Sequence, residues 1–401
     1  MNARTPSHTT LRLLLAAFAG IAAVVVAAAP AFASGKQGPV GGAFYKPPKS
    51  MPKGHGKLIW QRQATKLTPI DGAKLNKTVL YTSRSPQGKR VAVSGSVSVP
   101  KGRPPKGGWP VISWAHATIG TADVCAPTRI RPNSPDAAYV AYVKPQLEDW
   151  IDAGYAVVAT DYQGLGTPGD HPYLIGKAEG RSVLDIVSAA RQLIPSIGKR
   201  FLVAGHSQGG QSSLFAAALA DDWAPKLKLR GTVAYAPASH IKEQAALLPG
   251  LTSPSGLSAL AALIVRGAST TSKGVVKLLT PQAKALYPET RQVCLQRLAE
   301  PDSFGGLAPA DLLNKNADLT DFDDILGGMN PAVKTRAPVL LTQGSSDATV
   351  FPFFTDLLNG ELEKRGDDVT YKTYPGVNHG GIVAAAEDDA LAYFEKRLPP
   401  K

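Results

Sequence analysis

A short apolar strand, a serine between glycines and an alanine-rich helix follow one another in the middle of the chain. The strand covers residues 200–204, the motif GHSQG covers residues 205–209, and the helix covers residues 210–221. A serine on such a strand-to-helix turn is held on a strained backbone, with its hydroxyl exposed and a backbone N–H beside it. The glycines allow the strand and the helix to pack closely around the turn. The pattern therefore predicts an α/β fold in which Ser207 is a nucleophile.

Apolar runs and helical segments alternate on both sides of this turn. Strands are predicted at residues 77–84, 90–100, 109–117, 155–161, 231–238, 337–344 and 368–374, and helices at residues 136–153, 177–194 and 381–397. The central runs are almost continuously apolar, as expected for strands that are buried on both faces. Alternating strands and helices predict a mostly parallel sheet with helices on both faces. The turn at residues 85–88 joins the first two strands into an antiparallel edge.

Residues 241–336 interrupt this alternation with apolar helical patches, prolines and glycines. A connection of that length between two core strands is usually functional. We interpret it as a helical cap, inserted into a core made of residues 57–240 and 337–401. A separate C-terminal domain is the alternative, which the two core-type strands after the segment disfavour. Candidates for an acyl pocket in the cap are Leu257, Leu260, Leu263 and Ile264, with plain packing inside the cap as the other interpretation.

The first 33 residues have the pattern of a secretory signal peptide. Arg4 and Arg12 precede an apolar run at residues 13–29, and Ala31-Phe-Ala33 follows as a cleavage pattern. We expect cleavage after Ala33 and a secreted, extracellular protein. An uncleaved membrane anchor is the alternative, but its 17 apolar residues fall short of a comfortable span. Residues 34–56, rich in glycine, proline and lysine, are expected to form an extended N-terminal arm.

Charge and cysteine content narrow the class of protein further. Hydrophobic residues make up 44% of the chain and charged residues 19%, which is typical of a globular protein with a sizeable core. Without residues 1–33 the chain carries a net charge of +11, but no arginine-rich helix or zinc pattern indicates nucleic-acid binding. The two cysteines, Cys125 and Cys294, would enter an oxidising compartment, so a disulfide between them is expected. Two buried free thiols are the alternative.

A serine nucleophile needs a general base and an acid that orients the base. On a strand-to-helix elbow the three residues come in the order Ser, Asp or Glu, then His. Asp347 follows the strand at residues 337–344, and His379 follows the next strand, so both lie where open α/β sheets place their ligands. They are the predicted acid and base. The rivals for the acid are Asp356, which is expected within a helix, and Asp367 and Asp368, which precede a strand.

Negative charge on the attacked carbonyl oxygen must meet fixed hydrogen-bond donors. One donor is expected to be the backbone N–H of Gln208, and the other an N–H of Ala117 or Thr118 in the loop after residues 109–117. The Thr118 hydroxyl is a further candidate, and an ordinary loop is the alternative. The glycines at positions 164, 166 and 169 match a dinucleotide fingerprint, but prolines prolong the loop where that site needs a helix to begin. We therefore predict no cofactor and no metal.

Several motifs together resemble those of the secretory lipase (lipase-A-like) family within the α/β-hydrolase superfamily. They are CAP at residues 125–127, DYQGLG at 161–166, KAEGRSVLD at 177–185, GHSQGG at 205–210, the Asp347 loop and His379. The resemblance implies Ser207, Asp347 and His379 as a catalytic triad, a helical cap before the strand that carries the aspartate, and hydrolysis of carboxylic esters. Many α/β-hydrolases have His-Gly where this chain has His116-Ala117, so we expect an oxyanion loop of a different shape.

The sequence thus predicts a secreted serine ester hydrolase, a lipase or esterase that works through an acyl-enzyme. An extracellular acyltransferase or serine peptidase with the same triad is the alternative enzyme. An inactive binding module is the rival from another class, and the presence of all three triad residues disfavours it. The expected partners are a small-molecule or lipid ester and, transiently, a lipid interface. We expect a monomer.

Overall fold

The computed structural model describes residues 35–400, and the predicted signal peptide lies outside them. Nine strands form one sheet in the order β1-β2-β3-β5-β4-β6-β7-β8-β9. The strands are β1 (Leu58–Gln63), β2 (Leu75–Arg84), β3 (Arg90–Val99), β4 (Trp109–Ala115), β5 (Ala156–Thr160), β6 (Ile197–His206), β7 (Lys228–Tyr235), β8 (Val339–Gly344) and β9 (Val369–Tyr374). Strands β1, β2, β3 and β5 pair antiparallel, and the pairs from β5 through β4 to β9 are parallel. The predicted mostly parallel sheet with an antiparallel edge is confirmed.

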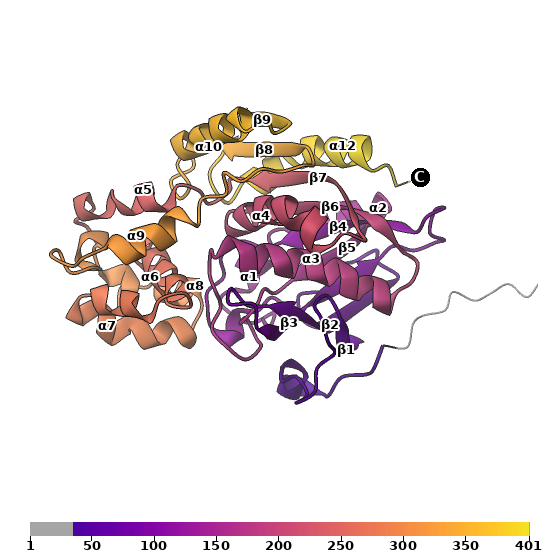
Figure 1. Ribbon diagram of the computed structural model, residues 1–401, viewed down its shortest axis with the longest axis horizontal. Coiled ribbons are helices and arrows are strands. Elements are labelled where there is room, and N and C mark those ends of the chain that lie inside the picture. The colour runs from indigo at the N-terminus through magenta and orange to yellow at the C-terminus, as the bar shows by residue number, and fades with distance from the viewer. Residues whose placement is uncertain (1–34, 401) are drawn as a thin grey trace, which may run out of the picture. The chain divides into compact units, whose positions relative to one another are not determined.

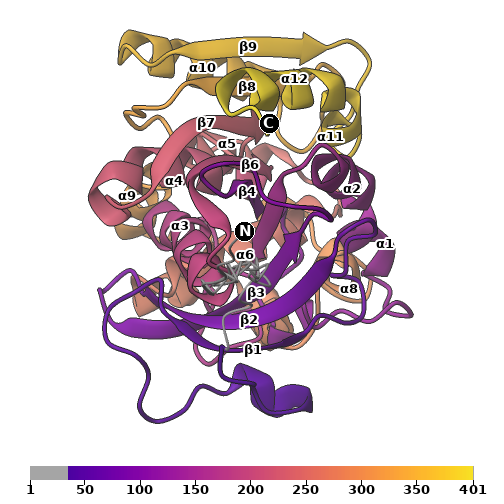
Figure 2. The ribbon, with the colours of Figure 1, turned by 90° about the vertical axis from the view of Figure 1, so that its right-hand side faces the viewer.

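Helices cover both faces of this sheet. The helices outside the β7–β8 connection are α1 (Ala137–Ala141), α2 (Lys144–Asp152), α3 (Gly176–Leu193), α4 (Gln208–Trp223), α10 (Pro352–Lys364), α11 (Ile382–Ala385) and α12 (Glu387–Arg397). Figure 2 shows α3 and α4 on one side of the strands and α2 on the other. Neighbouring residues of β4 and β6 point to opposite faces. Val111 and Val203 pack with α3 and α4, whereas Ile112 and Leu202 pack with α2 and α12.

The two long helices predicted at residues 136–153 and 381–397 are each divided into two. The first is interrupted at Tyr142 and Val143, just before Pro145, and the second is interrupted at Ala386. Proline is tolerated in the first turn of a helix but not in its interior, so α2 begins close to Pro145. Strand β1 was not expected from the sequence. Among residues 35–400, no helix combines the length and the apolar character needed to cross a bilayer.

The connection between β7 and β8 contains residues 241–336, which we call the inserted segment. Its helices are α5 (Ile241–Ala245), α6 (Leu257–Ala268), α7 (Pro281–Leu286), α8 (Leu295–Leu298) and α9 (Thr320–Gly327). They lie together at the left of Figure 1, around a hydrophobic cluster of their own that includes Leu263, Phe304 and Phe322. Tyr173 and Leu174, from the loop between β5 and α3, belong to the same cluster. The inserted segment therefore packs directly on a loop that leaves a core strand.

Candidate active site

Ser207 lies at the junction of β6 and α4, on the predicted strand-to-helix turn. Its backbone has φ 58° and ψ −115°, a conformation that L-residues rarely adopt. A Cβ atom on Gly209 would lie 1.9 Å from the carbonyl oxygen of Ala115, and one on Gly205 would lie 2.2 Å from the oxygen of Gly209. Only glycine fits at both positions. The two glycines therefore let α4 approach the sheet and fix the strained turn that presents Ser207.

Asp347 and His379 come together as predicted from the loops after β8 and β9. Nδ1 of His379 lies 2.7 Å from Oδ2 of Asp347, in hydrogen-bond contact. The other carboxylate oxygen of Asp347 accepts hydrogen bonds from the N–H groups of Thr349 at 2.8 Å and Val350 at 2.9 Å. Burial raises the pKa of Asp347, but the hydrogen bond and charge of His379 and the two N–H groups outweigh burial, so this pKa lies below its ordinary value. Asp347 is therefore an anion that orients the His379 ring.

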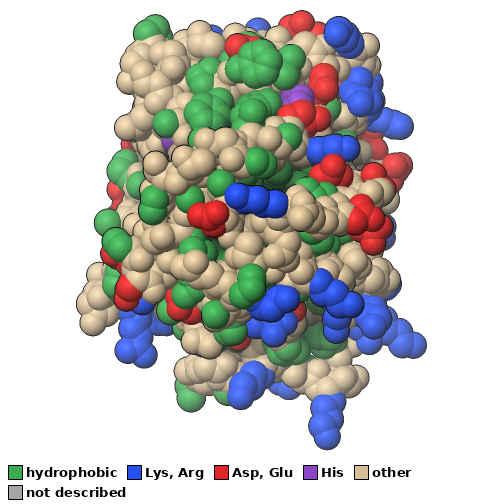
Figure 3. Space-filling view, turned by 90° about the vertical axis from the view of Figure 1, so that its left-hand side faces the viewer, with side chains coloured by type: hydrophobic (Ala, Val, Ile, Leu, Met, Phe, Trp, Pro, Cys, Tyr) green, Lys and Arg blue, Asp and Glu red, His purple; other side chains and the backbone are tan. Residues whose placement is uncertain are grey.

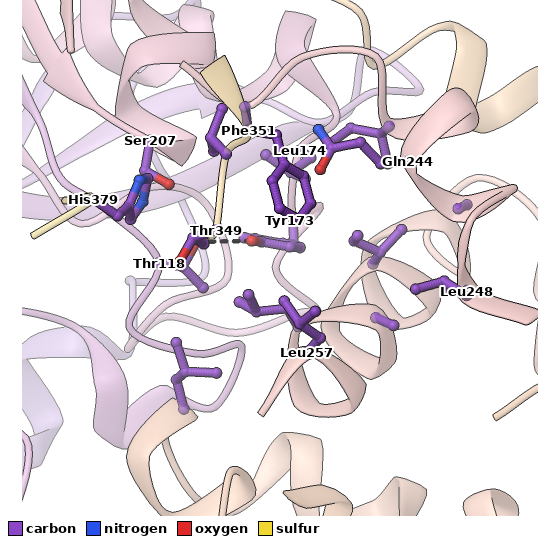
Figure 4. Close-up of a pocket in the computed structure, with 18 of the residues that line it drawn as sticks. Thr118, Tyr173, Leu174, Ser207, Gln244, Leu248, Leu257, Thr349, Phe351 and His379 are labelled. Carbon is purple, nitrogen blue, oxygen red and sulfur yellow. Dashed lines mark hydrogen bonds between the residues drawn. The ribbon is translucent and has the colours of Figure 1, made fainter. Parts of the chain in front are cut away.

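Two of the three residues line one cavity, and Asp347 lies behind His379. Ser207 and His379 are both among its wall residues, and Figure 4 shows them at the same side of it. The ring of His379 lies 4.6 Å from that of His206, the residue before Ser207. Within residues 35–400 no hydrogen bond joins Ser207 to His379. Such catalytic hydrogen bonds are often long before substrate binds.

The rival carboxylates have other partners, and so does His206. Tyr371 donates to Asp356, Thr335 donates to Asp367, and Arg397 lies 3.4 Å from Asp368. Tyr142 is hydrogen-bonded to His206, whose pKa is lowered well below its ordinary value by burial and then by the charge of His379. These contacts leave Asp347 as the carboxylate that is hydrogen-bonded to His379.

The expected oxyanion donors come from two segments of the chain. Gln208 is the first residue of α4, and Ala117 and Thr118 follow the end of β4. Within the described part of the chain, none of their three backbone N–H groups donates to a protein acceptor. All three residues are buried. Of the three residues, Thr118 lines the cavity with Ser207, whereas Gln208 and Ala117 are not among its wall residues. Because buried N–H groups are almost always paired, the three unpaired N–H groups remain the candidate donors to an oxygen of a bound substrate.

A buried carboxylate behind the turn was missed by sequence reasoning. Glu179, in α3, accepts hydrogen bonds from the Gln208 side chain at 2.8 Å, the Ser212 hydroxyl at 2.5 Å and the Leu174 N–H at 2.9 Å. Burial raises the pKa of Glu179 to about 7, although these hydrogen bonds lower it. His171 also contacts Gln208, and burial lowers the pKa of His171 to about 3. The only sequence signal for Glu179 was its place in the KAEGRSVLD motif.

Glu179→Gln is expected to change how stability depends on pH. The carboxyl group ionises near 4.5 in the unfolded chain and near 7 in the folded protein. The folded protein thus holds the extra proton between these values, so this group's contribution to the free energy of unfolding is present below pH 4.5 and is lost as the pH rises through 7. Urea denaturation from pH 4 to pH 8 should show a smaller fall in stability for Glu179→Gln. Glu363→Gln, at an exposed site, is the control and should keep the pH profile of the parent. A Glu179→Gln profile that also parallels the parent would contradict the raised pKa of Glu179.

The cavity has a volume of about 780 Å³ and mainly apolar walls. Leu257, Leu260 and Ile264 line it, and Leu263 does not. Leu257, Leu260 and Ile264 recur at helical spacing on one face of α6, whereas Leu263 points into the cluster of the inserted segment and is fully buried. Three of the four candidates for an acyl pocket thus face the cavity, and Leu263 is a packing residue.

The expected disulfide between Cys125 and Cys294 is present, with 5.5 Å between the Cα atoms. It joins the loop after β4 to the inserted segment. Nearby, the Leu295 N–H donates to the Ile119 oxygen at 2.7 Å, and the Thr121 hydroxyl donates to the Thr290 oxygen at 2.6 Å. The loop that carries Ala117 and Thr118 is therefore fastened to the inserted segment by a covalent bond and two hydrogen bonds.

The glycine-rich loop at residues 164–169 ends without a helix. Gly164, Gly166 and Gly169 all have positive φ, and α3 does not begin until Gly176. The helix N-terminus that a dinucleotide site needs at these glycines is therefore missing from this loop. Residues 35–400 hold no group of three or more His, Cys, Asp or Glu side chains arranged to bind a metal ion.

One protein family and two curated proteins match parts of this chain. Residues 140–298 match the family described as secretory lipase. Lipase A of Moesziomyces aphidis is 27% identical over 201 residues, which are 47% of this chain and 41% of that protein. The chain thus matches less than half the length of this curated relative. Acyl-protein thioesterase 1 of Gibberella zeae is 39% identical over 67 residues, 16% of this chain and 28% of that protein.

Solved structures show the same fold. Candida antarctica lipase A in its closed state superposes with a TM-score of 0.68 at 19% identity, covering 84% of this chain and 83% of that one. The rice cell wall degrading esterase LipA from Xanthomonas oryzae superposes with a TM-score of 0.67 at 18% identity, covering 86% and 98%. At this level of identity the superpositions establish the architecture, and the chemistry has to be argued from the residues of this chain.

Proposed function

We propose that this chain, a hydrolase that belongs to the secretory lipase family, cleaves carboxylic esters through an acyl-enzyme formed on Ser207. The observation that carries the proposal is the hydrogen bond to Asp347 of His379, which lines the same cavity as Ser207. A serine on a strained turn, a histidine and an ionised carboxylate are the three parts that acyl transfer needs. All of them lie at the same edge of the sheet, at the ends of β6, β8 and β9.

The chemistry follows from these positions. His379 takes the proton of Ser207 as its oxygen attacks the ester carbonyl, and returns a proton to the leaving alcohol as the C–O bond breaks. Water then attacks the acyl-enzyme with His379 again as base, which releases the acid and restores Ser207. Asp347 fixes the His379 tautomer and stabilises the imidazolium. The N–H groups of Gln208 and of Ala117 or Thr118 stabilise the oxyanion of each tetrahedral intermediate.

The inserted segment supplies the specificity in this proposal. It acts as a cap, and Leu257, Leu260 and Ile264 of α6 form an apolar wall for the acyl chain. Each methylene that enters such a wall contributes about 0.8 kcal/mol of transfer free energy. The cap and the acyl wall also give a role to the 96 residues of the inserted segment. Secretion after cleavage at Ala33 agrees with the family and with the disulfide.

A lipid interface is the proposed docking partner at the cavity mouth. Exposed large hydrophobic side chains lie in two short segments there: Leu247, Leu251, Phe351, Phe353 and Leu357. Leu247, Leu251 and Phe351 also line the cavity. Figure 3 shows hydrophobic side chains gathered on the face that carries the inserted segment. Exposed apolar patches of this kind mark interaction sites, and three residues of this patch belong to the cavity itself.

A panel of nitrophenyl esters from acetate to palmitate tests the function. We expect kcat/KM to rise by about fourfold for each of the first added methylenes, because each one leaves water for the apolar wall. A profile that is flat or falls from acetate onward contradicts the acyl wall. Faster cleavage of matched amides would favour a peptidase, and acyl transfer to an added alcohol in preference to water would favour an acyltransferase.

The same panel, run with dissolved and with emulsified esters, tests the interface. Phe353 is 62% exposed, so Phe353→Ser should lower the rate on emulsified ester while leaving the rate on dissolved ester unchanged. Val40→Ser is the matched control, because Val40 is 89% exposed in the N-terminal arm, away from the cavity walls. Equal effects of the two variants on emulsified ester would exclude the patch as the docking surface.

A further inference from the structure

Two buried hydroxyl groups meet in the wall of the cavity. The Thr118 Oγ1 and the Tyr173 hydroxyl oxygen are 2.7 Å apart, and the two residues are 3% and 4% exposed. Thr118 comes from the loop after β4 and Tyr173 from the loop between β5 and α3. Both line the cavity with Ser207 and His379, and Figure 4 shows the hydrogen bond between them. Two loops that leave neighbouring strands thus bring a pair of hydroxyls to the same space as the nucleophile.

One proton of this pair is left without an acceptor. Two hydroxyls carry two protons, and the contact between them uses one. Across residues 35–400, neither side chain has a second hydrogen-bond partner. A phenol is the stronger donor and an aliphatic hydroxyl the stronger acceptor, so Tyr173 donates to Thr118. Burial raises the pKa of Tyr173, which keeps its proton in place. The Thr118 hydroxyl then has a proton to offer to an oxygen in the cavity.

Tyr173 packs closely against the inserted segment. Helix α6 passes so close to it that a Cβ atom on Gly267 would lie 2.1 Å from the Tyr173 carbonyl oxygen. Tyr173 also belongs to the hydrophobic cluster of the inserted segment. A donor that is fixed in advance costs no reorganisation when charge develops on the substrate.

We propose that the Thr118 hydroxyl is a donor of the oxyanion hole in addition to the backbone N–H groups, and that Tyr173 is a positioning residue that aims it. The inference rests on the proposed ester hydrolysis and deepens it. Thr118 lines the cavity with Ser207 and lies in the loop whose N–H groups are the proposed donors, so its hydroxyl is expected on the oxyanion side of the site. The inserted segment thereby influences the rate of the reaction, because it holds Tyr173 in place and Tyr173 in turn positions Thr118.

Removal of each hydroxyl separates the two roles. Thr118→Val keeps the shape of the side chain and is expected to lower kcat on a dissolved ester by about 100-fold with KM within twofold. Thr118→Ser returns the hydroxyl and should recover most of that loss. Tyr173→Phe should lower kcat by a smaller factor, about fivefold to tenfold. The double variant Thr118→Val/Tyr173→Phe should be no slower than Thr118→Val alone, because Tyr173 acts through Thr118.

Binding of a boronic acid provides a second readout. Its tetrahedral adduct with the nucleophile resembles the intermediate, so its inhibition constant should rise in Thr118→Val by about the factor by which kcat falls. Tyr287→Phe is the matched control, since Tyr287 lies in the same hydrophobic cluster and bonds Ser269 away from the cavity wall. Unchanged melting temperatures confirm that each variant is folded.

Failure of the inference differs from failure of the proposed function. If Ser207→Ala is inactive but Thr118→Val keeps the parental kcat, the Thr118 hydroxyl is not a donor, and the proposed function still stands. Additive losses in the double variant overturn the positioning role of Tyr173. A Ser207→Ala variant that retains parental activity overturns the proposed function and the inference with it.

Discussion

Ser207→Ala is expected to lower kcat/KM for ester hydrolysis by about one million-fold, and His379→Ala by a similar factor. The two residues act as one unit, so the double variant should be no slower than either single one. Asp347→Asn keeps the geometry but favours the wrong His379 tautomer, which should cost about ten thousand-fold in kcat. Initial rates on a soluble nitrophenyl ester, with folding checked by circular dichroism, measure all of these losses.

Matched controls come from the same elements. Ser213 lies in α4 and donates to the Gly209 oxygen at 2.7 Å, so Ser213→Ala removes a buried hydroxyl that does not line the cavity. Asp356→Asn removes the rival carboxylate, whose partner is Tyr371. Both should stay within a few-fold of the parent. Near-parental turnover by Ser207→Ala or His379→Ala, or a large loss in Asp356→Asn alone, would show that the triad is assigned to the wrong residues.

Removal of the disulfide is expected to have the largest effect on stability. Cys125 and Cys294 are 169 positions apart, and closing so long a loop in the unfolded chain contributes up to about 5 kcal/mol in the chain-entropy description. The free energy of unfolding of Cys125→Ala/Cys294→Ala, from urea denaturation, should fall by several kcal/mol. The same should hold for the reduced parent.

The disulfide variant should also lose activity for a structural reason. The bond fastens the loop that carries Ala117 and Thr118 to the inserted segment, so its loss frees the donors from their fixed position. We expect kcat to fall at a temperature where the variant is still folded, and this is measured against Ser213→Ala as the reference. An unchanged denaturation midpoint would contradict the stability argument, and a variant with parental kcat would contradict the link to the oxyanion loop.

The elements that chemistry and periodicity mark strongly were predictable from the sequence. The glycines around Ser207 are required by close contacts with Ala115 and Gly209, so the motif already specified the turn. Asp347 and His379 were predicted because each follows a predicted strand, and the ends of parallel strands meet at one edge of the sheet. The order of the strands in space, with β5 between β3 and β4, was not predicted from the sequence.

Other features depend on contacts between residues that are far apart in the sequence. Strand β1 forms by pairing with β2, and its short mixed pattern gives no clear period of its own. Tyr173 and Glu179 matter because the fold brings them to Thr118 and Gln208, which lie 55 and 29 positions away. Leu263 was grouped with the pocket candidates because it is as apolar as they are. Its position in the helical repeat places it on another face of α6 than Leu257, Leu260 and Ile264.

Labelling with a fluorophosphonate tests the central claim most directly. The reagent phosphonylates an activated serine, and the labelled peptide is identified by mass spectrometry. We predict one label per chain, on Ser207, loss of ester hydrolysis in proportion to labelling, and no label in Ser207→Ala or in the unfolded parent. A folded parent that remains unlabelled, or one labelled at another serine, would contradict the account.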